Sequence, residues 1–433
     1  MADDVRSIAV EGMARVEGEG SLHVSVRDGA VADVSLDIFE PPRFFEALLR
    51  GRHFTEAPDI TARICGICPV AYQTSACTAL EAACGVTVDS RIQALRRLLY
   101  CGEWIQSHAL HIYLLHAPDF LGCADAVELA ERDRAGVARG LAIKRTGNEL
   151  MTVVGGRSIH PVNVRVGGFW QAPTREAVAA LAGPLDQARQ DALATVAWVA
   201  GFDFPDVESD YRFVALHTGD CYPVESGRVV SRGLLDATAE EFSYRVVEEH
   251  VARSTALHAR IDGELTYLTG PLARYALNSR LLPEVARRAA AEAGLEEVCR
   301  NPFRSIVVRA VELVFACDEA LRLVEGYEPP DPPAAACSAP DTGSVGAGAS
   351  EAPRGLLLHR YELDGRGMIT TARIVPPTSQ NQRAIEEDLR RVVTSSLSLD
   401  DPELTLRCEQ AVRNHDPCIS CAAHFLDLTV EER

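Results

Sequence analysis

Four cysteines, arranged as two Cys-x-x-Cys pairs, are the residues of this sequence best suited to bind a metal ion. Cys65 and Cys68 form one pair near the start of the chain, and Cys418 and Cys421 form the other near its end. A Cys-x-x-Cys turn directs both sulfurs to one side, so two pairs can offer four thiolates if the fold brings them together. Pro69 suits the first turn of a helix. Cys68 would then lie at a helix N-terminus, where the helix dipole lowers the pKa of a thiol.

The spacing alone leaves several kinds of site open. A structural zinc site is the simplest alternative, and a redox-active dithiol and a disulfide framework are the others. The flanking residues favour a reactive site, because Arg63 precedes the first pair, Asp416 and Pro417 lead into the second, and His424 follows it. Charged groups around a cluster of thiolates indicate chemistry more than a structural knuckle.

Two segments resemble a known family. The sequences Arg-Ile-Cys-Gly-Ile-Cys-Pro at 63–69 and Asp-Pro-Cys-Ile-Ser-Cys-Ala-Ala-His at 416–424 resemble those of the large (alpha, catalytic) subunit of nickel-iron hydrogenases. The resemblance runs from about Ala14 to the last residue. It is greatest to the soluble, cytoplasmic, NADP-linked bidirectional branch, which is sulfhydrogenase-like. The resemblance implies an enzyme that splits and forms dihydrogen heterolytically.

The same resemblance implies roles for the four cysteines. Cys65 and Cys418 would be terminal ligands of nickel. Cys68 and Cys421 would bridge nickel to an iron that carries carbon monoxide and cyanide. Nickel is soft enough to favour thiolates, and bridging thiolates can hold a second metal close by.

Charged residues in family-like motifs are expected to act on this centre. The proton from dihydrogen would go to the Cys418 thiolate or toward Arg354, and Glu17, in Arg-x-Glu-Gly, would then relay it outward, which requires a buried carboxyl with a raised pKa. Arg354, in Pro-Arg-Gly, would lie over the metals, and Asp416 would orient it by an ion pair. Without the family, an exposed turn and a surface ion pair are the ordinary interpretations of Glu17 and Arg354.

The resemblance also implies a second metal site. Glu46 and His424 would bind a magnesium ion, with water and a main-chain carbonyl near Arg373 completing an oxygen-rich octahedron. A solvated helix face is the alternative interpretation of Glu46. Pro376 and Thr378 match the stretch that contacts the diatomic ligands of iron in the family.

Several residues differ from the family or carry a simpler interpretation. Ser107 stands where many members have an aspartate, and Tyr72 stands where many have a histidine beside a bridging cysteine. His108 and His111 are one helical turn apart and could bind a metal, but we expect them to be core histidines.

The resemblance implies several partners. The cysteines show no ferredoxin-type spacing, so electrons would leave through a small subunit with iron-sulfur clusters. Beyond it we expect diaphorase subunits that bind FAD and NADP(H). A maturation chaperone and a C-terminal endopeptidase are also implied, and the endopeptidase would remove the tail 425–433 after nickel insertion.

Composition limits the other functions. The 433 residues are 47% hydrophobic and 24% charged, as in soluble globular proteins, and the formal net charge is −19. An acidic chain lacks the basic footprint of a nucleic-acid-binding protein. The sequence has no run of 18 apolar residues, so we expect no membrane-spanning helix. We also expect no signal peptide at the acidic start. Thirteen cysteines without secretory context fit a reducing cytoplasm.

The expected fold is mainly α with β additions (α+β): a single large-subunit domain, 1–433, with a core of long helices. Alternating Val24, Val26 and Val34, Leu36, around Asp28-Gly29, predict an N-terminal antiparallel β region over 7–39. A Pro, Ala, Gly and Ser-rich stretch predicts a flexible surface loop at 329–350. Helical spacing predicts helices at 43–50, 69–84, 90–115, 174–200 (capped by Thr174), 283–298, 303–325, 381–396 (capped by Asn381) and 402–413.

Two other functional hypotheses remain open at this point. One is a zinc-stabilised scaffold without enzymatic activity, although such relatives typically lack the four cysteines. The other is a hydrogen-sensing relative, a group that usually lacks a cleavable tail. Metal content would distinguish the first from a hydrogenase, and turnover rate would distinguish the second.

Overall fold

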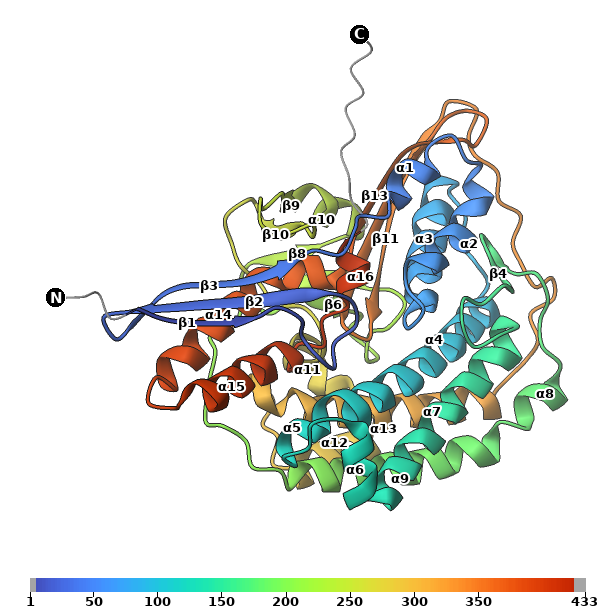
Figure 1. The fold of residues 1–433 in the computed structure, drawn as a ribbon. Helices are drawn as coiled ribbons and strands as arrows, with labels where there is room; N and C mark the ends of the chain where they lie inside the picture. Colours follow the sequence, from blue (N-terminus) through green and yellow to red (C-terminus); the bar gives the residue numbers. More distant parts are fainter. Residues whose placement is uncertain (1–4, 424–433) are drawn as a thin grey trace, which may run out of the picture.

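The computed structural model describes residues 5–423 and shows a mainly helical protein with small antiparallel sheets. Long helices form a bundle at the lower right of Figure 1, and the N-terminal sheet extends away from it to the left. The end of the described chain lies between these two parts, near the centre of the molecule. This arrangement is of the predicted α+β class.

Four long helices form the bundle: α4 (Ser90–Leu110), α7 (Arg134–Gly155), α9 (Ala182–Ala200) and α13 (Ser305–Glu325). Almost every residue of α13 up to Cys317 is buried, so this helix is the centre of the core. The core helices predicted at 90–115, 174–200 and 303–325 are confirmed, with differences at their ends.

Those differences have local causes. A π-helical turn, His111–His116, follows α4 directly, so the α-helix ends before residue 115. The segment predicted at 174–200 is divided into α8 (Arg175–Ala179) and α9. The Thr174 side chain accepts a hydrogen bond from the Ala177 amide, as its predicted role as N-cap requires.

Glycines explain why the sequence does not predict α7 and how this helix packs. Gly140 and Gly147 lower the helix propensity of the segment. A Cβ at Gly147 would lie 2.7 Å from the carbonyl oxygen of Gly102 on α4, and one at Gly140 would lie 2.3 Å from the Tyr113 ring. The glycines therefore permit a close approach of α7 to α4 and to the π-helical turn.

The predicted N-terminal β region is confirmed. Its strands are β1 (Val5–Val10), β2 (Gly20–Arg27) and β3 (Ala30–Ile38), in the order β1-β2-β3. Asp28 and Gly29 both have positive φ, as a two-residue hairpin turn requires. One face of this sheet packs against a C-terminal helix, α14 (Pro377–Ser395).

The prediction of a surface loop at 329–350 is wrong for the second part of this range. Residues 344–352 form β11 (Ser344–Ala352), which pairs antiparallel with β12 (Gly355–Leu363), and β12 pairs with β13 (Ile369–Val375). Irregular structure is confined to residues 327–343 of this region.

The small residues of β11 serve close packing. The helix α3 (Pro69–Ala83) lies directly on this strand. A Cβ at Gly346 would lie 2.1 Å from the Ala79 carbonyl oxygen, and one at Gly348 would lie 2.5 Å from the Ala79 amide nitrogen. The small residues of β11, which are typical of a loop, are explained by the close packing of α3 on this strand.

The prediction that Asn381 is the N-cap of a helix is also wrong. α14 begins at Pro377, four residues earlier, with Pro376 as its N-cap residue. Asn381 lies inside the helix, where its buried side chain accepts a hydrogen bond from the Thr269 amide at 2.9 Å. The next helix, α15 (Asp401–Arg413), is capped by the Asp400 side chain.

Short elements complete the molecule. The remaining helices are α1 (Phe45–Leu49), α2 (Ala57–Thr61), α5 (Ala117–Phe120), α6 (Ala126–Arg132), α10 (Ala239–Arg245), α11 (Pro271–Asn278), α12 (Glu284–Glu292) and α16 (Ile419–Ala422). The remaining strands are β4 (Val164–Arg165), β5 (Gly168–Phe169), β6 (Ala215–His217), β7 (Arg228–Ser231), β8 (Leu235–Ala237), β9 (Val246–Glu249) and β10 (His258–Ile261).

Two hydrophobic clusters meet where the cysteine pairs lie. The larger cluster joins the helix bundle and α3 and contains all four of the paired cysteines. The second cluster joins the N-terminal sheet, α14 and α15, and contains Ile419, Ala422 and Ala423. The segment around α16 therefore joins the two clusters: its cysteines pack in the first, and its neighbouring apolar side chains pack in the second.

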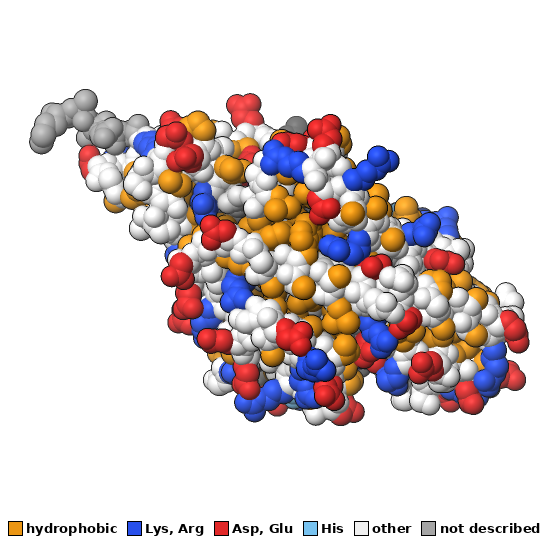
Figure 2. All heavy atoms as spheres, turned by 90° about the horizontal axis from the view of Figure 1, so that it is seen from below, with side chains coloured by type: hydrophobic (Ala, Val, Ile, Leu, Met, Phe, Trp, Pro, Cys, Tyr) orange, Lys and Arg blue, Asp and Glu red, His pale blue; other side chains and the backbone are white. Residues whose placement is uncertain are grey.

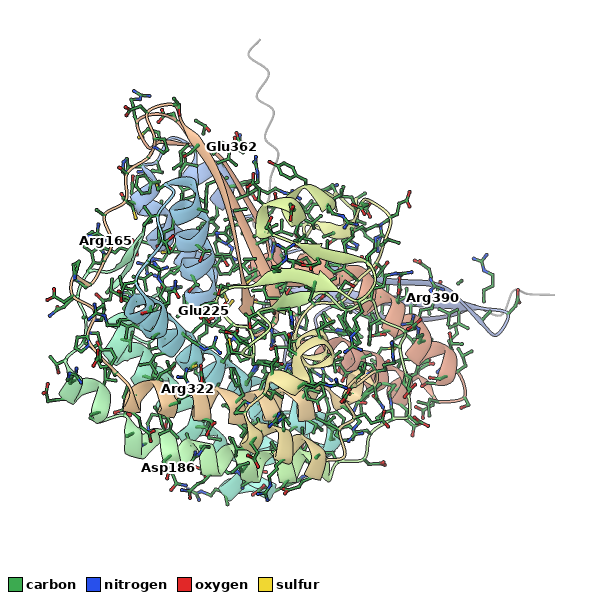
Figure 3. The ribbon with its side chains drawn as sticks, turned by 180° about the vertical axis from the view of Figure 1, so that it is seen from behind. Arg165, Asp186, Glu225, Arg322, Glu362 and Arg390 are labelled. Carbon is green, nitrogen blue, oxygen red and sulfur yellow. The ribbon has the colours of Figure 1, made fainter. Side chains whose placement is uncertain are left out.

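The surface carries mixed charge. On the face in Figure 2, acidic and basic side chains surround apolar ones, and α9 and α12 line a cleft of about 740 Å³. Seen from behind, Glu362 lies on the long hairpin at the top and Asp186 on the bundle at the bottom (Figure 3). Within residues 5–423, no helix is both long and apolar enough to cross a membrane.

Candidate metal centre

The fold brings the two cysteine pairs together. The Sγ atoms of Cys65 and Cys418 are 3.6 Å apart, those of Cys68 and Cys421 are 3.8 Å apart, and those of Cys418 and Cys421 are 2.9 Å apart. All four sulfurs are buried and lie within 4.8 Å of one another. Metal–thiolate bonds of about 2.3 Å place neighbouring sulfurs at about 3.7 Å in a tetrahedral site. The four side chains thus fit a shared metal centre.

The ionisation of these thiols favours a bound cation. The pKa of Cys65 is held well below its usual value, chiefly by hydrogen bonds from Cys418 and Cys421 to its thiolate. The pKa of Cys418 is raised well above its usual value, because its protonated thiol donates hydrogen bonds to the sulfurs of Cys421 and Cys65. One thiolate can form in this buried group, but further thiolates need a compensating positive charge.

The first pair is positioned at the start of α3. Cys68 is the N-cap residue and Pro69 occupies the first turn, so the predicted helix start is confirmed. The Cys65 sulfur accepts the amide hydrogens of Ile67 and Cys68, both at 3.3 Å. Glu103, from α4, accepts the next free amide of the helix, that of Val70, at 2.6 Å.

The second pair is held by contacts with distant segments. The Ile419 amide donates to the Glu17 carbonyl at 2.9 Å, and the Cys418 amide donates to Thr378 Oγ1 at 3.0 Å. Glu17 also contacts the pair through its side chain. Its Oε2 lies 3.0 Å from the Cys418 sulfur and accepts the Ser420 amide at 3.1 Å. Glu17 is therefore placed to exchange a proton with Cys418.

Arg354 lies beside the four thiols and is completely buried in the core. It donates from Nε to the Asp416 carbonyl and from Nη2 to Asp416 Oδ1, both at 3.1 Å, so the predicted ion pair is present. Nη1 lies 3.4 Å from Ser107 Oγ. Burial alone would lower the pKa of Arg354, but the charge of Asp416, followed by the neighbouring Cys418 and Cys68 sulfurs, raises it well above its usual value. Arg354 is a fixed positive charge at this site.

Arg43 joins the two cysteine segments. Its Nη2 donates to the carbonyl of Ile64, just before the first pair, at 2.8 Å, and also to the carbonyl of Ser420. Its amide donates to the Ala423 carbonyl at 3.0 Å. Sequence reasoning missed this residue, because it lies far from both pairs in the chain and its role depends on carbonyl groups.

The core histidines do not belong to the thiol group. His111 contacts the Arg413 carbonyl at 3.0 Å, and His108 lies 3.2 Å from Glu312. Burial lowers the pKa of both rings. Their expected placement in the core is confirmed.

Two further predicted site segments are Glu46 and the stretch with Pro376 and Thr378. Glu46 Oε1 accepts the Ile374 amide at 2.6 Å, and burial raises the pKa of this carboxyl to about 7. The predicted second ligand, His424, lies outside the described residues. Pro376 precedes α14, whose Thr378 is the residue that contacts Cys418.

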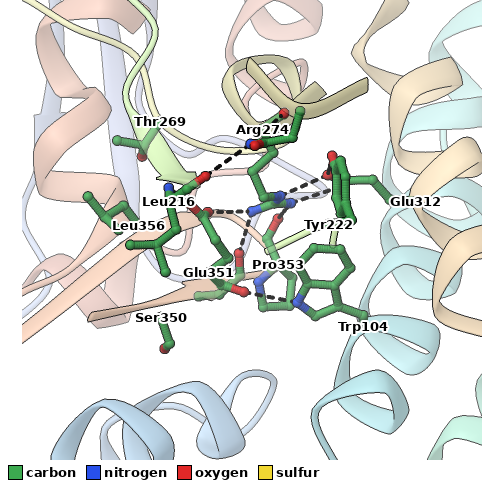
Figure 4. Close-up of polar contacts among 12 residues, drawn as sticks. Trp104, Leu216, Tyr222, Thr269, Arg274, Glu312, Ser350, Glu351, Pro353 and Leu356 are labelled. Atoms are coloured by element: carbon green, nitrogen blue, oxygen red, sulfur yellow. Dashed lines mark hydrogen bonds and ion pairs between the residues drawn. The ribbon is translucent and has the colours of Figure 1, made fainter. Parts of the chain in front are cut away.

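Tyr72 lies on α3 close to the thiols. It is fully buried, and burial, followed by the charges of Cys421 and Cys68, raises the pKa of its phenol well above the usual value. It therefore stays neutral where a histidine would titrate. Arg274, in the Pro-Leu-Ala-Arg segment, is a second residue whose role the sequence does not reveal. Its guanidinium donates to the Ala352 and Pro353 carbonyls, just before Arg354 in the chain (Figure 4).

Comparison with known proteins assigns the class. The nickel-dependent hydrogenase family matches residues 43–139, which include the first cysteine pair. Relatives more than 30% identical cover almost the whole chain. The chain therefore belongs to the nickel-dependent hydrogenase family, as a large, catalytic subunit.

Two individual relatives match this chain over almost its whole length. The alpha subunit of sulfhydrogenase 1 from Pyrococcus furiosus is 31% identical over 425 residues, covering 97% of this chain and 98% of that protein. The alpha subunit of sulfhydrogenase 2 from the same organism is 32% identical over 432 residues, covering 97% and 100%.

Solved structures agree with this fold. An NAD⁺-reducing [NiFe]-hydrogenase in the H2-reduced state superposes with a TM-score of 0.86 at 27% identity, over 97% of this chain and 99% of that one. The Ni-Fe-Se hydrogenase from D. vulgaris Hildenborough has a TM-score of 0.78 at 23% identity, over 97% and 100%. The second likeness concerns the fold alone.

Proposed function

We propose that this chain is the catalytic subunit of a cytoplasmic nickel-iron hydrogenase that exchanges electrons with NADP(H). The observation that carries the proposal is the group of four buried thiols, within 4.8 Å of one another. A structural zinc site would use the same thiols. It would have no need of Glu17 beside one sulfur or of a buried Arg354 charge.

Each thiol has a proposed role. Cys65 and Cys418 would hold nickel as its terminal ligands, and Cys68 and Cys421 would hold it together with an iron that carries carbon monoxide and cyanide. The pairing of sulfurs supports this division, because each cysteine of the first pair faces one of the second. When bound, this centre supplies the site at which dihydrogen is cleaved heterolytically.

Glu17 is the proposed acceptor of the proton. A proton on the Cys418 sulfur lies 3.0 Å from Glu17 Oε2, so one short transfer moves it to the carboxylate. The Ser420 amide donates to the same oxygen and holds it in place. Glu17 then passes the proton outward and returns to its ionised form.

Arg354 and Asp416 are proposed to prepare the site electrostatically. A guanidinium remains charged when it is desolvated, and its planar group keeps several donors in fixed directions. Two bonds to Asp416 hold this group beside the thiols. Thr378, and beside it Pro376, are proposed to line the iron side of the centre, which the contact of Thr378 with the Cys418 amide supports.

Glu46 is proposed to bind magnesium together with His424. In the absence of a cation, burial raises the pKa of Glu46 to about 7. A divalent ion at the carboxylate would oppose this effect and keep the group ionised. Water and a carbonyl near Arg373 would supply the further oxygen ligands.

The proposed partners follow from the path of electrons. The cysteines outside the four are scattered through the described chain, so the clusters that carry electrons would belong to an iron-sulfur small subunit. Diaphorase subunits with FAD would then reach NADP(H). The relatives named as alpha subunits of sulfhydrogenases and the likeness to an NAD⁺-reducing hydrogenase support this class of acceptor.

Maturation is proposed to involve a chaperone and an endopeptidase that cleaves after His424. Residues 425–433 lie outside the described residues. The intact mass of the large subunit in an active preparation should correspond to a chain that ends at His424. An active subunit that retains the whole of 425–433 would contradict this step.

The main experiment is metal analysis and infrared spectroscopy on the complex purified anaerobically with its partners. We expect nickel and iron near one each per large subunit, cyanide and carbonyl bands, and hydrogen-dependent reduction of NADP. Zinc in place of nickel, without these bands after co-expression of the maturation proteins, would favour a scaffold. The bands with only very slow turnover would favour a hydrogen sensor.

A further inference from the structure

Arg274 is a fully buried arginine that the proposed chemistry does not use. It lies on α11, and its guanidinium carbon lies 4.5 Å from the centroid of the Trp104 ring. Nε and Nη2 donate to the two carboxylate oxygens of Glu312, both at 2.8 Å. Figure 4 shows this side chain between Glu312 on one side and the 351–353 segment on the other.

The remaining donors of Arg274 reach the segment just before Arg354. Nη1 donates to Glu351 Oε2 at 3.1 Å and to the Ala352 carbonyl at 2.8 Å. Nη2 donates to the Pro353 carbonyl at 2.9 Å. All five N–H groups of the guanidinium are therefore used. Three of these five bonds fix consecutive residues that lead into Arg354.

The turn that carries Arg354 is enclosed from another direction as well. Ala352 pairs with Gly355 at the end of the hairpin, so Pro353 and Arg354 are its two turn residues. A Cβ at Gly270 would lie 2.7 Å from the Arg354 carbonyl oxygen. The loop before α11 thus packs directly on the turn. Gly270 permits this close contact, and Arg274 donates hydrogen bonds to the residues just before Arg354.

We propose that Arg274 is a positioning residue for Arg354: it fixes the backbone of the Pro353-Arg354 turn and so the place of the Arg354 guanidinium beside the four thiols. This inference rests on the proposed function, in which the Arg354 charge acts on the metal centre. Lysine could not replace Arg274, because a single ammonium cannot make a two-bond contact with Glu312 and reach two carbonyls as well.

The test compares Arg274→Lys with Arg96→Lys in the complex purified with its partners. Arg96 is a matched control, because it is buried and makes a two-bond contact with Glu81 (2.8 and 2.5 Å) away from the turn. The readouts are nickel and iron content, the cyanide infrared bands, hydrogen turnover, and hydrogen–deuterium exchange of the peptide 350–358.

For Arg274→Lys we expect wild-type metal content, shifted cyanide bands, faster exchange in 350–358 and turnover lower by about 10- to 100-fold, because small displacements of an active-site group cost rates of this order. Arg96→Lys should change none of these four readouts. Loaded Arg274→Lys protein whose bands, turnover and exchange match those of Arg96→Lys would overturn the proposal.

Two further arms cover the other outcomes. If Arg274→Lys does not assemble, Gly270→Ala displaces the same turn while Arg274 and its buried contacts stay in place, and loaded Gly270→Ala protein with wild-type bands and turnover would overturn the proposal. If the wild-type complex itself lacks cyanide bands, the proposed function fails. Exchange in 350–358 would still decide whether Arg274 holds the turn, by being faster or unchanged in Arg274→Lys.

Discussion

The two cysteine pairs reach one site by different means. The first pair is built locally, at the start of the 15-residue helix α3, where Cys68 is the N-cap residue and the Cys65 sulfur accepts nearby amides. In the second pair, Cys418 is the N-cap residue of α16 and Cys421 lies within it, and this helix has only four residues. A helix this short has little stability of its own, so tertiary contacts must hold it.

Those tertiary contacts come from several parts of the fold. Glu17 and Thr378 bind the backbone of α16 and of Cys418, and Arg354 binds the Asp416 carbonyl. The adjacent His415 ring contacts Asp388 of α14 at 2.8 Å. The difference teaches that the geometry of the first pair depends on nearby sequence, whereas that of the second depends on the completed fold.

The largest effect should come from removing a sulfur from either pair. Cys65→Ser and Cys418→Ser should both lose nickel and with it all measurable turnover, because a lost ligand removes the centre itself, whereas residues that only support a ligand cost about 10- to 100-fold. Nickel content and hydrogen uptake of the purified complex measure this. Cys337→Ser, which lies outside the group of four, is the control. Full nickel content in either variant would contradict the shared centre.

A smaller effect, restricted to the second pair, is expected for Glu17→Gln. Glutamine keeps an oxygen that can accept the Ser420 amide but cannot take a proton from Cys418. Turnover should fall by about 10²- to 10⁴-fold with unchanged metal content. The exposed Glu19→Gln, in the same segment, should behave as wild type. Near-normal turnover in Glu17→Gln would remove this residue from the proton path.

Asp388→Asn should weaken the support of the second pair. The Asp388 carboxylate is buried and contacts His415, Ser209 at 2.5 Å and Tyr211. A neutral amide there leaves buried groups poorly satisfied, so the free energy of unfolding should fall by about 1–3 kcal/mol at pH 7. Asp186→Asn, at a partly exposed surface carboxylate, is the control, and equal stabilities of the two variants would contradict the prediction.

The pH dependence of this effect has a defined sign. Burial alone would raise the pKa of Asp388, but its contacts with His415, Ser209 and Tyr211 lower it below the usual value. Its stabilisation is therefore present above the unfolded pKa of about 3.9 and is lost as pH falls through the lower folded pKa. The stability difference between wild type and Asp388→Asn should shrink on acidification below about pH 4, as denaturant unfolding would measure. A constant difference would count against the assigned pKa direction.

The smallest effect is expected for Glu103→Gln, which alters the support of the first pair. Burial, the largest cause, raises the pKa of Glu103 well above its usual value, so glutamine resembles the protonated side chain. An amide oxygen can still accept the Val70 amide, at 2.6 Å, and only the longer bond from the Ala71 amide, at 3.1 Å, is lost, so the loss should be about 1 kcal/mol. Calorimetry would measure it. If Glu103→Gln lowered the free energy of unfolding as much as Asp388→Asn, the proposed distinction would fail, because the first pair would then depend on tertiary contacts as much as the second.

The sequence predicted the parts of the molecule that have a local pattern. Alternation around Asp28-Gly29 predicted the hairpin of β2 and β3, and helical spacing predicted α3, α4 and α13. Prediction failed where packing decides the structure. β11 was taken for part of a loop, because its small residues fit a helix packed against a strand. The glycines of α7, which permit a close helix approach, hid that helix.

The candidate site divides in the same way. Cys65, Cys68, Cys418 and Cys421 were recognisable from spacing and resemblance, and the structure brings them together. Arg43 and Arg274 were not recognisable, because both act by donating to carbonyl groups of distant segments. Backbone acceptors carry no sequence identity, so only the fold reveals such contacts.

The most direct test of the central claim is anomalous X-ray diffraction from crystals of the mature complex, at the nickel, iron and zinc absorption edges. The account predicts one nickel and one iron peak among the four sulfurs, with Cys68 and Cys421 between the two metals and Cys65 and Cys418 on nickel alone. A single zinc peak bound by all four sulfurs would contradict it.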